Sequence, residues 1–333
     1  MKKRVILLLF CGGMLNQVSY SQQYLYSQYF STPLTLNPAL TGYFNGRTRF
    51  SSNSRSQWGE DGNPFKSLTA SVEQKFLTNS NKGKFGVGLL FSSDNSNLDA
   101  YSVKKAALSA AYNKALDQDG NIELGAGFQG QFNQLRINPY LLTFDSQFAS
   151  GGFNSSIATP EMAKATTMSY TSLNAGILLN IKFLEGNQLY FGLAAYNSNQ
   201  PKTNFMDEAF YEPIRWNIQT GGTIPIDTRG SLHLSSIFSV QQGKSEILLG
   251  GVGSFNLDED ETGNKLLVGS WIRLKDALIP YLGLNWNDIQ VALSYDISTS
   301  SIKTLSSNRS SMEFSLGYKL WKHDKGEIPC PNF

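Results

Sequence analysis

The residues of this chain that could support chemistry are few, and one group lies around a histidine. His233 has Ser231 and Ser235 two positions away on either side, so a strand would place all three on one face, as a hydrolase could use them. Serines are abundant in this chain, however, and neither of these two lies in a nucleophile motif. We therefore predict no catalytic residue and no enzyme activity.

The acidic run from Asp258 to Glu261 is the second group, and it suggests a calcium loop. It lacks the alternating ligand spacing and the closing glutamate of such loops, so a solvated turn is the better interpretation. The sequence also contains no phosphate-binding loop, nucleotide motif or metal-ligand cluster. We predict no metal site and no cofactor.

The N-terminal end has the three parts of a secretory signal peptide. Basic residues from Lys2 to Arg4 precede an apolar segment from Val5 to Leu15, and Ser19-Tyr20-Ser21 forms a cleavage site of small residues. We expect residues 1–21 to be removed before Gln22. The mature chain would then be exported.

Export changes the interpretation of the charges and the cysteines. Without residues 1–21 the chain has 25 basic and 26 acidic residues, so its formal net charge falls from +2 to −1. A chain with this charge is not expected to bind nucleic acid. The bulky Phe10 before Cys11 argues against a lipoprotein signal, and Cys330 is then the single cysteine, so no intramolecular disulfide can form.

The segment from Gly120 to Arg136 sets the pattern that most of the chain repeats. Apolar residues alternate with polar residues or glycine over about fifteen positions, which is longer than most strands of soluble sheets. A tilted strand that crosses a bilayer has this length, with one face toward lipid and the other toward a wet lumen. We predict an all-β fold, a transmembrane antiparallel β-barrel of about fourteen strands within residues 45–322. The predicted strands span 45–58, 64–77, 84–93, 100–115, 120–136, 170–183, 189–195, 213–226, 231–241, 245–257, 265–274, 277–286, 289–297 and 310–321.

Two further patterns follow from this interpretation. Arg47, Arg49 and Arg55 alternate along the first predicted strand, where we expect them to line the lumen and pair with acidic neighbours. Large aromatic residues near strand ends are candidates for interfacial belts. These residues are Tyr112, Trp216, Trp271, Trp286 and Trp321.

The connections between the predicted strands differ in length on the two sides. Compact turns lie at 117–120, 185–187 and 227–229, whereas long segments at 137–168, 197–212 and 299–309 fall on the opposite side. Outer-membrane barrels have short periplasmic turns and longer extracellular loops. We therefore expect both termini in the periplasm, with residues 323–333 as a C-terminal tail.

Residues 22–44 precede the first predicted strand and form an arm. The arm has several aromatic residues near its start, and Pro33 and Pro38 suit neither a helix nor a strand ladder. The aromatic side chains need burial. We expect the arm to be ordered against the lumen or the periplasmic rim.

Short motifs occur in order in four regions of the chain. Ser27-Gln28-Tyr29-Phe30 is followed by Leu36-Asn37-Pro38-Ala39 with Gly42, then by Arg55-Ser56-Gln57-Trp58, then by 293–300, and finally by Ile328-Pro329-Cys330-Pro331 after the last predicted strand. Together they resemble the motifs of the PorP/SprF family of type IX secretion outer-membrane proteins. The residues that match the family pattern are Gln28, Tyr29, Asn37, Pro38, Gly42, Arg55, Gln57, Trp58, Cys330 and Pro331.

The resemblance implies a barrel that works beside the type IX translocon. Such a barrel is paired with one large surface protein, often an adhesin of the kind used in gliding motility, and is needed for its secretion or attachment through its C-terminal domain. The two longest loops match little of the family pattern, and loops commonly choose the partner. The candidate contact residues are Phe144, Phe148, Phe153, Phe205, Phe210 and Tyr211.

A passive diffusion porin for small solutes is the alternative function, because the same fold permits it. A porin needs no ordered arm, whereas a barrel that holds a partner can use one as a plug. The arm at residues 22–44 therefore favours the first function.

Overall fold

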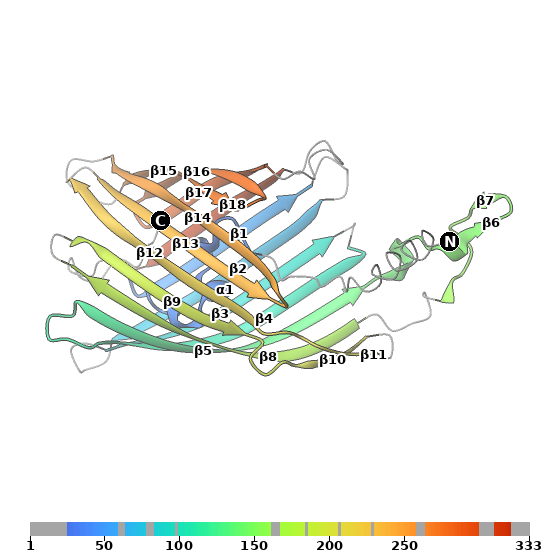
Figure 1. Cartoon of the computed structure of the whole chain (residues 1–333), viewed down its shortest axis with the longest axis horizontal. Coiled ribbons are helices and arrows are strands. Elements are labelled where there is room, and N and C mark those ends of the chain that lie inside the picture. The colour runs from blue at the N-terminus through green and yellow to red at the C-terminus, as the bar shows by residue number, and fades with distance from the viewer. Residues whose placement is uncertain are drawn as a thin grey trace, which may run out of the picture.

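The computed structural model describes residues 25–58, 64–77, 83–96, 99–160, 167–183, 186–205, 208–227, 230–257, 264–299 and 310–320 (Figure 1). Within these residues, fourteen long strands form one closed antiparallel barrel. They are β1 (Thr48–Gln57), β2 (Phe65–Leu77), β3 (Gly83–Ser96), β4 (Tyr101–Ala115), β5 (Ile122–Ile137), β8 (Thr167–Lys182), β9 (Gln188–Tyr196), β12 (Arg215–Asp227), β13 (Gly230–Gln241), β14 (Lys244–Asn256), β15 (Lys265–Arg273), β16 (Ala277–Trp286), β17 (Ile289–Ser298) and β18 (Ser311–Leu320).

The barrel closes between its first and last strands. β1 pairs with β18 along its whole length, from Thr48 opposite Leu320 to Gln57 opposite Ser311. A closed barrel has no unpaired strand edge. Unpaired edge groups would be costly in the hydrocarbon of a bilayer. The predicted number and boundaries of the strands are confirmed to within a few residues. None of the helices in the described residues is both long and apolar enough to span a membrane.

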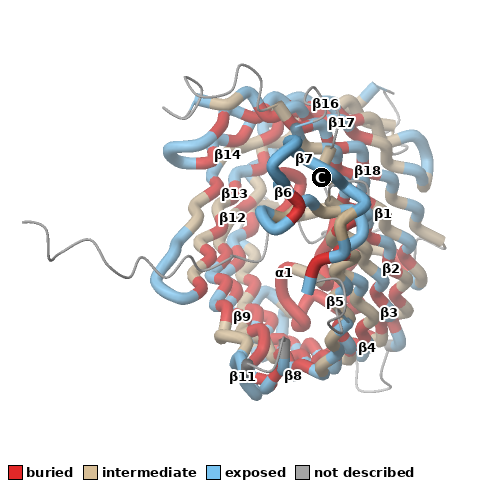
Figure 2. The backbone as a smooth tube through the Cα atoms, turned by 90° about the vertical axis from the view of Figure 1, so that its right-hand side faces the viewer, coloured by how far each residue is buried: buried red, intermediate tan, exposed pale blue. Residues whose placement is uncertain are grey.

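The two faces of each strand differ as the alternation predicts. On β5, Leu124, Phe128 and Phe132 are exposed on the outside, whereas Gln129 and Asn133 are buried on the inside. Alternation of this kind is visible around the barrel wall in Figure 2. The outer face therefore suits hydrocarbon, and the inner face presents hydrogen-bonding groups to whatever fills the lumen.

The barrel has two unlike ends. The end that carries the long connections, here called the loop end, bears two small hairpins in addition to the barrel strands. β6 (Phe148–Ala149) pairs with β7 (Gly152–Phe153), and β10 (Lys202–Phe205) pairs with β11 (Glu208–Tyr211). In Figure 1 both hairpins extend from the same end of the barrel. The opposite end, the turn end, carries the connections 116–121 and 287–288 and the start of β1.

The arm lies inside the barrel. It forms three short helical segments, η1 (Tyr29–Ser31), α1 (Pro33–Leu36) and η2 (Pro38–Leu40), and nearly every described residue from Leu25 to Phe44 is buried. Figure 2 looks at the loop end and shows α1 within the ring of strands. The expectation that the two prolines suit no helix is wrong. Each occupies the first turn of a helical segment, where its missing N–H is not needed and its fixed φ is favourable.

Two other expectations need correction. Trp271 is not in an interfacial belt but points inward and is buried, because aromatic residues of the arm pack against it. Arg47 is exposed at the turn end just before β1, so only Arg49 and Arg55 of the predicted series line the lumen. The predicted signal peptide, the acidic run 258–261, Trp321 and the C-terminal tail lie outside the described residues.

Candidate functional site

The first part of the arm is held by two carboxylates of the last strands. The backbone N–H groups of Ser27 and Gln28 donate to the two oxygens of Glu313, over 2.7 and 2.8 Å. The hydroxyl of Ser27 donates to Asp296 over 2.7 Å. Hydrogen bonds to ionised acceptors are about twice as strong as neutral ones. The arm start is thus fixed by direct polar contacts rather than by loose packing.

Two arginines neutralise these buried carboxylates. Arg55 lies 3.1 Å from Asp296 and 3.0 Å from Glu313, and Arg273 lies 3.0 Å from Asp296. The four side chains are almost completely shielded from solvent. A buried charge that loses its partner is strongly destabilising. We call Arg55, Arg273, Asp296 and Glu313 the charge clamp.

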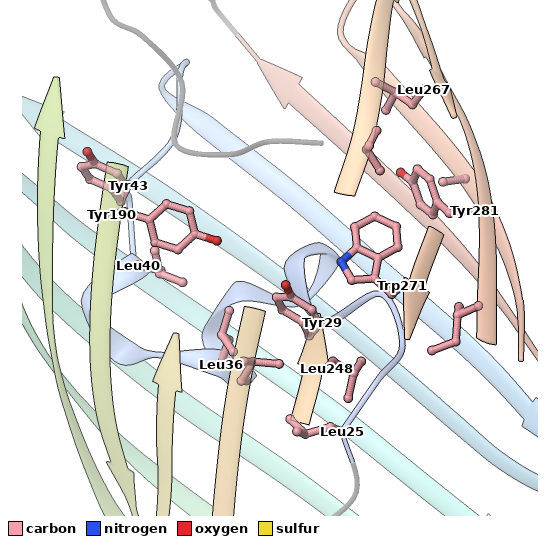
Figure 3. Packing of buried hydrophobic residues seen from close by; sticks show 14 of the residues in the cluster. Leu25, Tyr29, Leu36, Leu40, Tyr43, Tyr190, Leu248, Leu267, Trp271 and Tyr281 are labelled. Atoms are coloured by element: carbon pink, nitrogen blue, oxygen red, sulfur yellow. The ribbon is translucent and has the colours of Figure 1, made fainter. Parts of the chain in front are cut away.

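An aromatic cluster holds the next residues of the arm. The Phe30 ring lies 4.9 Å from the Trp271 ring and 5.5 Å from the Tyr281 ring. The hydroxyl of Tyr29 donates to Ser235 over 2.5 Å, and burial raises the pKa of Tyr29 to about 12. Figure 3 shows Tyr29 and Trp271 between the arm and the wall formed by the later strands. Buried apolar side chains of these strands, among them Ile237, Leu248 and Ile279, belong to the same cluster.

The middle of the arm lies against glycines of the opposite wall. A β-carbon at Gly86 would collide with the backbone of Thr41, and one at Gly127 would collide with the backbone of Pro38. A β-carbon at Gly176 would collide with Asn37. The inward positions of β3, β5 and β8 therefore leave a channel that fits the arm backbone. We call Gly86, Gly127 and Gly176 the glycine channel.

The end of the arm is fixed at the turn end by a second set of charges. Tyr43 donates its hydroxyl to Glu123 over 3.0 Å, and Gly42 donates its N–H to Glu73 over 3.1 Å. Arg49 pairs with Glu73 at 2.8 Å. Gly42 has a φ of +70°, and its Cα faces Gly86, so a side chain there would be both strained and obstructed.

Two of the family-motif residues, Gln28 and Asn37, fix the arm through side-chain hydrogen bonds. Gln28 donates to Ser294 over 3.0 Å and accepts from Ser315 over 2.6 Å. Asn37 donates to the carbonyl of Ile177 over 2.9 Å and accepts from the Ala39 N–H over 2.8 Å.

The other motif residues lie in the arm, on or next to β1, or outside the described residues. Pro38 starts η2, and Arg55 belongs to the charge clamp. Gln57 and Trp58 lie at the loop end of β1, with Trp58 exposed and at a φ of +56°. Cys330 and Pro331 lie outside the described residues.

The predicted contact residues are at the loop end, and the structure brings some of them together. The rings of Phe148 and Phe153 lie 5.5 Å apart across the first hairpin, and both are exposed. Phe210 and Tyr211 are exposed on the second hairpin. Phe144 is half-buried.

The remaining loop-end predictions are only partly described. Phe205 ends β10, and its side-chain environment is not described. Of the predicted loop 299–309, only residue 299 is described.

Only one of the two serines that flank His233 in the sequence contacts its ring. Ser231 and Thr223 lie within 3.0 and 2.8 Å of the two ring nitrogens of His233. Ser235 bonds to Tyr29 of the arm instead. Among the described residues, no group of three or more His, Cys, Asp or Glu side chains could hold a metal ion.

Several residues of this site were not predicted individually from the sequence. Glu313 lies directly opposite Arg55 in the pairing of β1 with β18. An acidic residue at an inward position of the last strand could therefore have been predicted as a partner of Arg55, once the pairing of the first and last strands was assumed. Arg273 and Glu73 are likewise charges at inward positions. The glycines of the channel give no such signal, because glycines also occur on the outer face, as at Gly130.

Comparison with known proteins agrees with this architecture. Residues 18–318 match the family model of the type IX secretion system membrane protein PorP/SprF. The chain belongs to the PorP/SprF family. It is therefore a membrane barrel of a secretion system. No curated protein matches the chain.

Solved structures place the PorP/SprF chain among outer-membrane barrels by fold alone. The toluene transporter TbuX of Ralstonia pickettii is similar with a TM-score of 0.56 and 7% identity, over 91% of this chain and 96% of that one. The toluene transporter TodX of Pseudomonas putida is similar with a TM-score of 0.50 and 11% identity, over 86% and 93%. At these identities the likeness concerns the barrel and not its cargo.

Proposed function

We propose that this barrel receives and holds one secreted surface protein at its loop end, by the C-terminal domain of that protein. The partner is an adhesin, of the kind that gliding motility employs, and it reaches the barrel from the type IX translocon. The barrel contributes binding and positioning and no catalysis. Membership of the PorP/SprF family supports the association with secretion.

The observation that carries this proposal is the filled lumen. The arm contacts the first strands through Tyr26, which bonds to Thr69, and the last strands through Ser27. It contacts the middle strands through Leu34 and Leu36, whose carbonyls accept from Tyr196 and Asn217. A lumen occupied on all sides is poorly suited to solute passage. The surface left for a partner is the loop end with its exposed aromatic hairpins.

The composition of the two hairpins supports the same assignment. Phe148, Phe153, Phe210 and Tyr211 are exposed rings on short strands, next to serine, asparagine and threonine residues. Aromatic anchors with adaptable polar neighbours are typical of protein-binding loops. The barrel supplies the rigid frame for them.

Replacing residues 138–166 with Gly-Asn tests the proposal. We expect a folded barrel in the outer membrane and a partner that is lost from the cell surface or released into the medium. Shortening the turn-end connection 116–121 is the matched control and should leave the partner displayed. Full display of the partner after this replacement and after additional removal of the β10–β11 hairpin would contradict binding at the loop end.

Point variants test whether the aromatic side chains themselves contact the partner, since they leave the length of the loop unchanged. Changing Phe148 and Phe153 to serine should weaken capture of the partner domain by purified barrel roughly tenfold or more, because buried aromatic anchors carry most of the energy of such interfaces. Leu116 and Leu257 are exposed apolar residues near the turn end, and their serine variants should bind as the native chain does.

The porin alternative has a direct electrical test. Because the arm fills the lumen, we expect the purified protein to give no steady conductance in planar bilayers. Deleting residues 22–44 should create an open pore. Steady open conductance of the native protein would support the porin and contradict a plugged lumen.

We also propose how the chain is processed and placed. Residues 1–21 are removed as a signal peptide, the barrel of residues 45–322 spans the outer membrane with its loop end outside, and residues 323–333 remain in the periplasm. Mass spectrometry of the mature protein should give Gln22 as its first residue. Protease added to intact cells should cut the loop-end hairpins and leave the turn-end connections uncut.

A further inference from the structure

The outer face of β2 to β5 near the loop end carries three cations in two neighbouring rows. Lys66, Asn95, Ser102 and Arg136 lie side by side across the four strands, as the strand register shows. The next row toward the turn end contains Lys104. All three cationic side chains are exposed and point away from the lumen. The outer wall therefore has a basic patch, here defined as Lys66, Lys104 and Arg136.

An apolar depression lies directly below this patch. Ala70, Phe91, Ala106 and Phe132 form one row across the same four strands, so small and large side chains alternate. The small residues and the taller rings, together with Leu68, line a depression of about 320 Å³ that Lys104 borders. The row below is apolar. The depression thus opens toward the hydrocarbon of the bilayer.

The height of the patch matches the lipid headgroups. The outward apolar positions of β5 run from Ile122 to Phe132, and at the usual rise and tilt these span roughly 25–28 Å along the membrane normal. This is about the height of the apolar band of outer-membrane barrels. Gln134 and Arg136 follow immediately. The cations therefore lie where hydrocarbon gives way to headgroups.

No described acidic side chain balances the charges of the patch. Within the described residues none of the three cations makes an ion pair, and no described side chain in these outward rows is acidic. On the inner face of the same region, Lys105 does have an acidic partner, Asp94, at 3.8 Å. The outer cations thus remain available to an anion from the membrane.

We propose that this face binds a phosphorylated, multiply acylated glycolipid of the outer leaflet, with its phosphates on Lys66, Lys104 and Arg136 and one acyl chain in the depression. Lys66 and Arg136 lie three strands apart, roughly 14 Å at the usual strand spacing. Cations spread over this width suit phosphates at the two ends of a disaccharide headgroup better than one phosphate. The site is independent of the partner-binding function and depends only on the outward orientation of the loop end.

The test uses purified full-length barrel and bisphosphorylated lipid A, with binding measured by native mass spectrometry and by a lipid-dependent rise in thermal stability. The combined variant Lys66→Gln, Lys104→Gln and Arg136→Gln should weaken binding by roughly tenfold or more, since basic residues at a membrane surface act approximately additively. The matched control changes Lys114, Lys244 and Lys275, which are exposed elsewhere on the barrel, and should bind as the native chain does. Heat-modifiable migration on gels verifies that each variant folds.

Two further measurements sharpen the result. Ala106→Trp fills the depression without changing charge, and it should reduce binding while leaving the barrel folded. Lipid A without phosphates should bind much more weakly than the bisphosphorylated form. Equal binding of both lipid forms, equal binding by the native and triple variants, or a stronger preference for cardiolipin vesicles would each overturn the proposal.

Discussion

The two halves of the lumen wall hold the arm in different ways. On one side the glycine channel admits the backbone of residues 37–42 and leaves no space for a side chain. On the other side the charge clamp and the aromatic cluster hold residues 27–30 through side chains. No side chain larger than hydrogen fits at the glycines of the channel, because the arm backbone lies against them. The contacts of the charge clamp and the aromatic cluster can instead be weakened one at a time. The first half therefore fixes where the arm lies, and the second half sets how firmly its start is held.

The largest expected effect comes from filling the glycine channel. Gly127→Leu should displace the whole arm, because the new side chain would occupy the position of the Pro38 backbone. Chymotrypsin suits the measurement, since residues 22–44 contain aromatic and leucine sites but no lysine or arginine. We expect rapid cleavage throughout the arm and a rise in bilayer conductance.

The control for this variant lies on the same strand. A β-carbon at Gly130 meets no protein atom, because this residue faces outward. Gly130→Leu should leave the arm protected and the conductance unchanged. Equal exposure of the arm in both variants would mean that damage to β5 itself, and not the channel, releases the arm.

The next effect should be confined to the start of the arm. Glu313→Ala removes the acceptor of two arm N–H groups and leaves Arg55 with a single carboxylate, a loss on the order of 3 kcal/mol. Chymotrypsin should then cut near Tyr26 and Phe30 but not near Tyr43. Glu246→Gln alters a carboxylate that pairs with Arg273 and should leave the arm protected. Uniform cleavage along the arm would show that the two halves are not independent.

A smaller effect is expected from the aromatic cluster. Phe30→Leu keeps an apolar side chain but loses the ring contacts with Trp271 and Tyr281, which are worth about 1 kcal/mol beyond buried area. The cleavage rate at the arm start should rise about fivefold at this free energy. Phe76→Leu changes a ring pair on the lipid side and should have no effect on the arm.

The smallest effect is a dependence on alkaline pH. Burial raises the pKa of Tyr29 to about 12, against about 10 for a tyrosine in water. Because the pKa of Tyr29 is higher in the bound arm than in the released arm, Tyr29 stabilises the bound arm fully below pH 10. This stabilisation is lost as the pH rises toward 12. Protection of the arm start should fall over this range. Tyr29→Phe should remove this part of the pH dependence, and an unchanged profile would show that another group controls it.

The fold was predictable because lipid and lumen impose a period of two on every strand. The prediction failed where both faces of a strand are apolar, as on β15, where Leu267 and Trp271 point inward and Val268 and Ile272 outward. Alternation cannot distinguish the faces there. The inward tryptophan packs against Phe30, which belongs to a distant part of the chain, and against Tyr281 of β16.

The candidate site was predictable only in part for a similar reason. The arm and the lumen-facing position of Arg55 were predicted, but the contact of Arg55 with the carboxylates that hold the arm was not. The path of the arm depends on glycines, whose role appears only when two backbones meet. Exposed aromatic residues in long loops were found from composition. The pairing of Phe148 with Phe153 needed the hairpin geometry.

The contact between Ser27 and Glu313 joins residues 286 positions apart in the sequence. Loop closure over such a distance is entropically unfavourable until intervening strands are paired. The same last strand that supplies Glu313 also closes the barrel against β1. The arm can therefore be fixed by Glu313 only after the final strand has been inserted. A chain truncated before β18 would lack both the β1–β18 pairing that closes the barrel and the carboxylate that holds the start of the arm. An arm that is bound through the Ser27–Glu313 contact therefore indicates that the whole chain has been synthesised and the barrel has been closed.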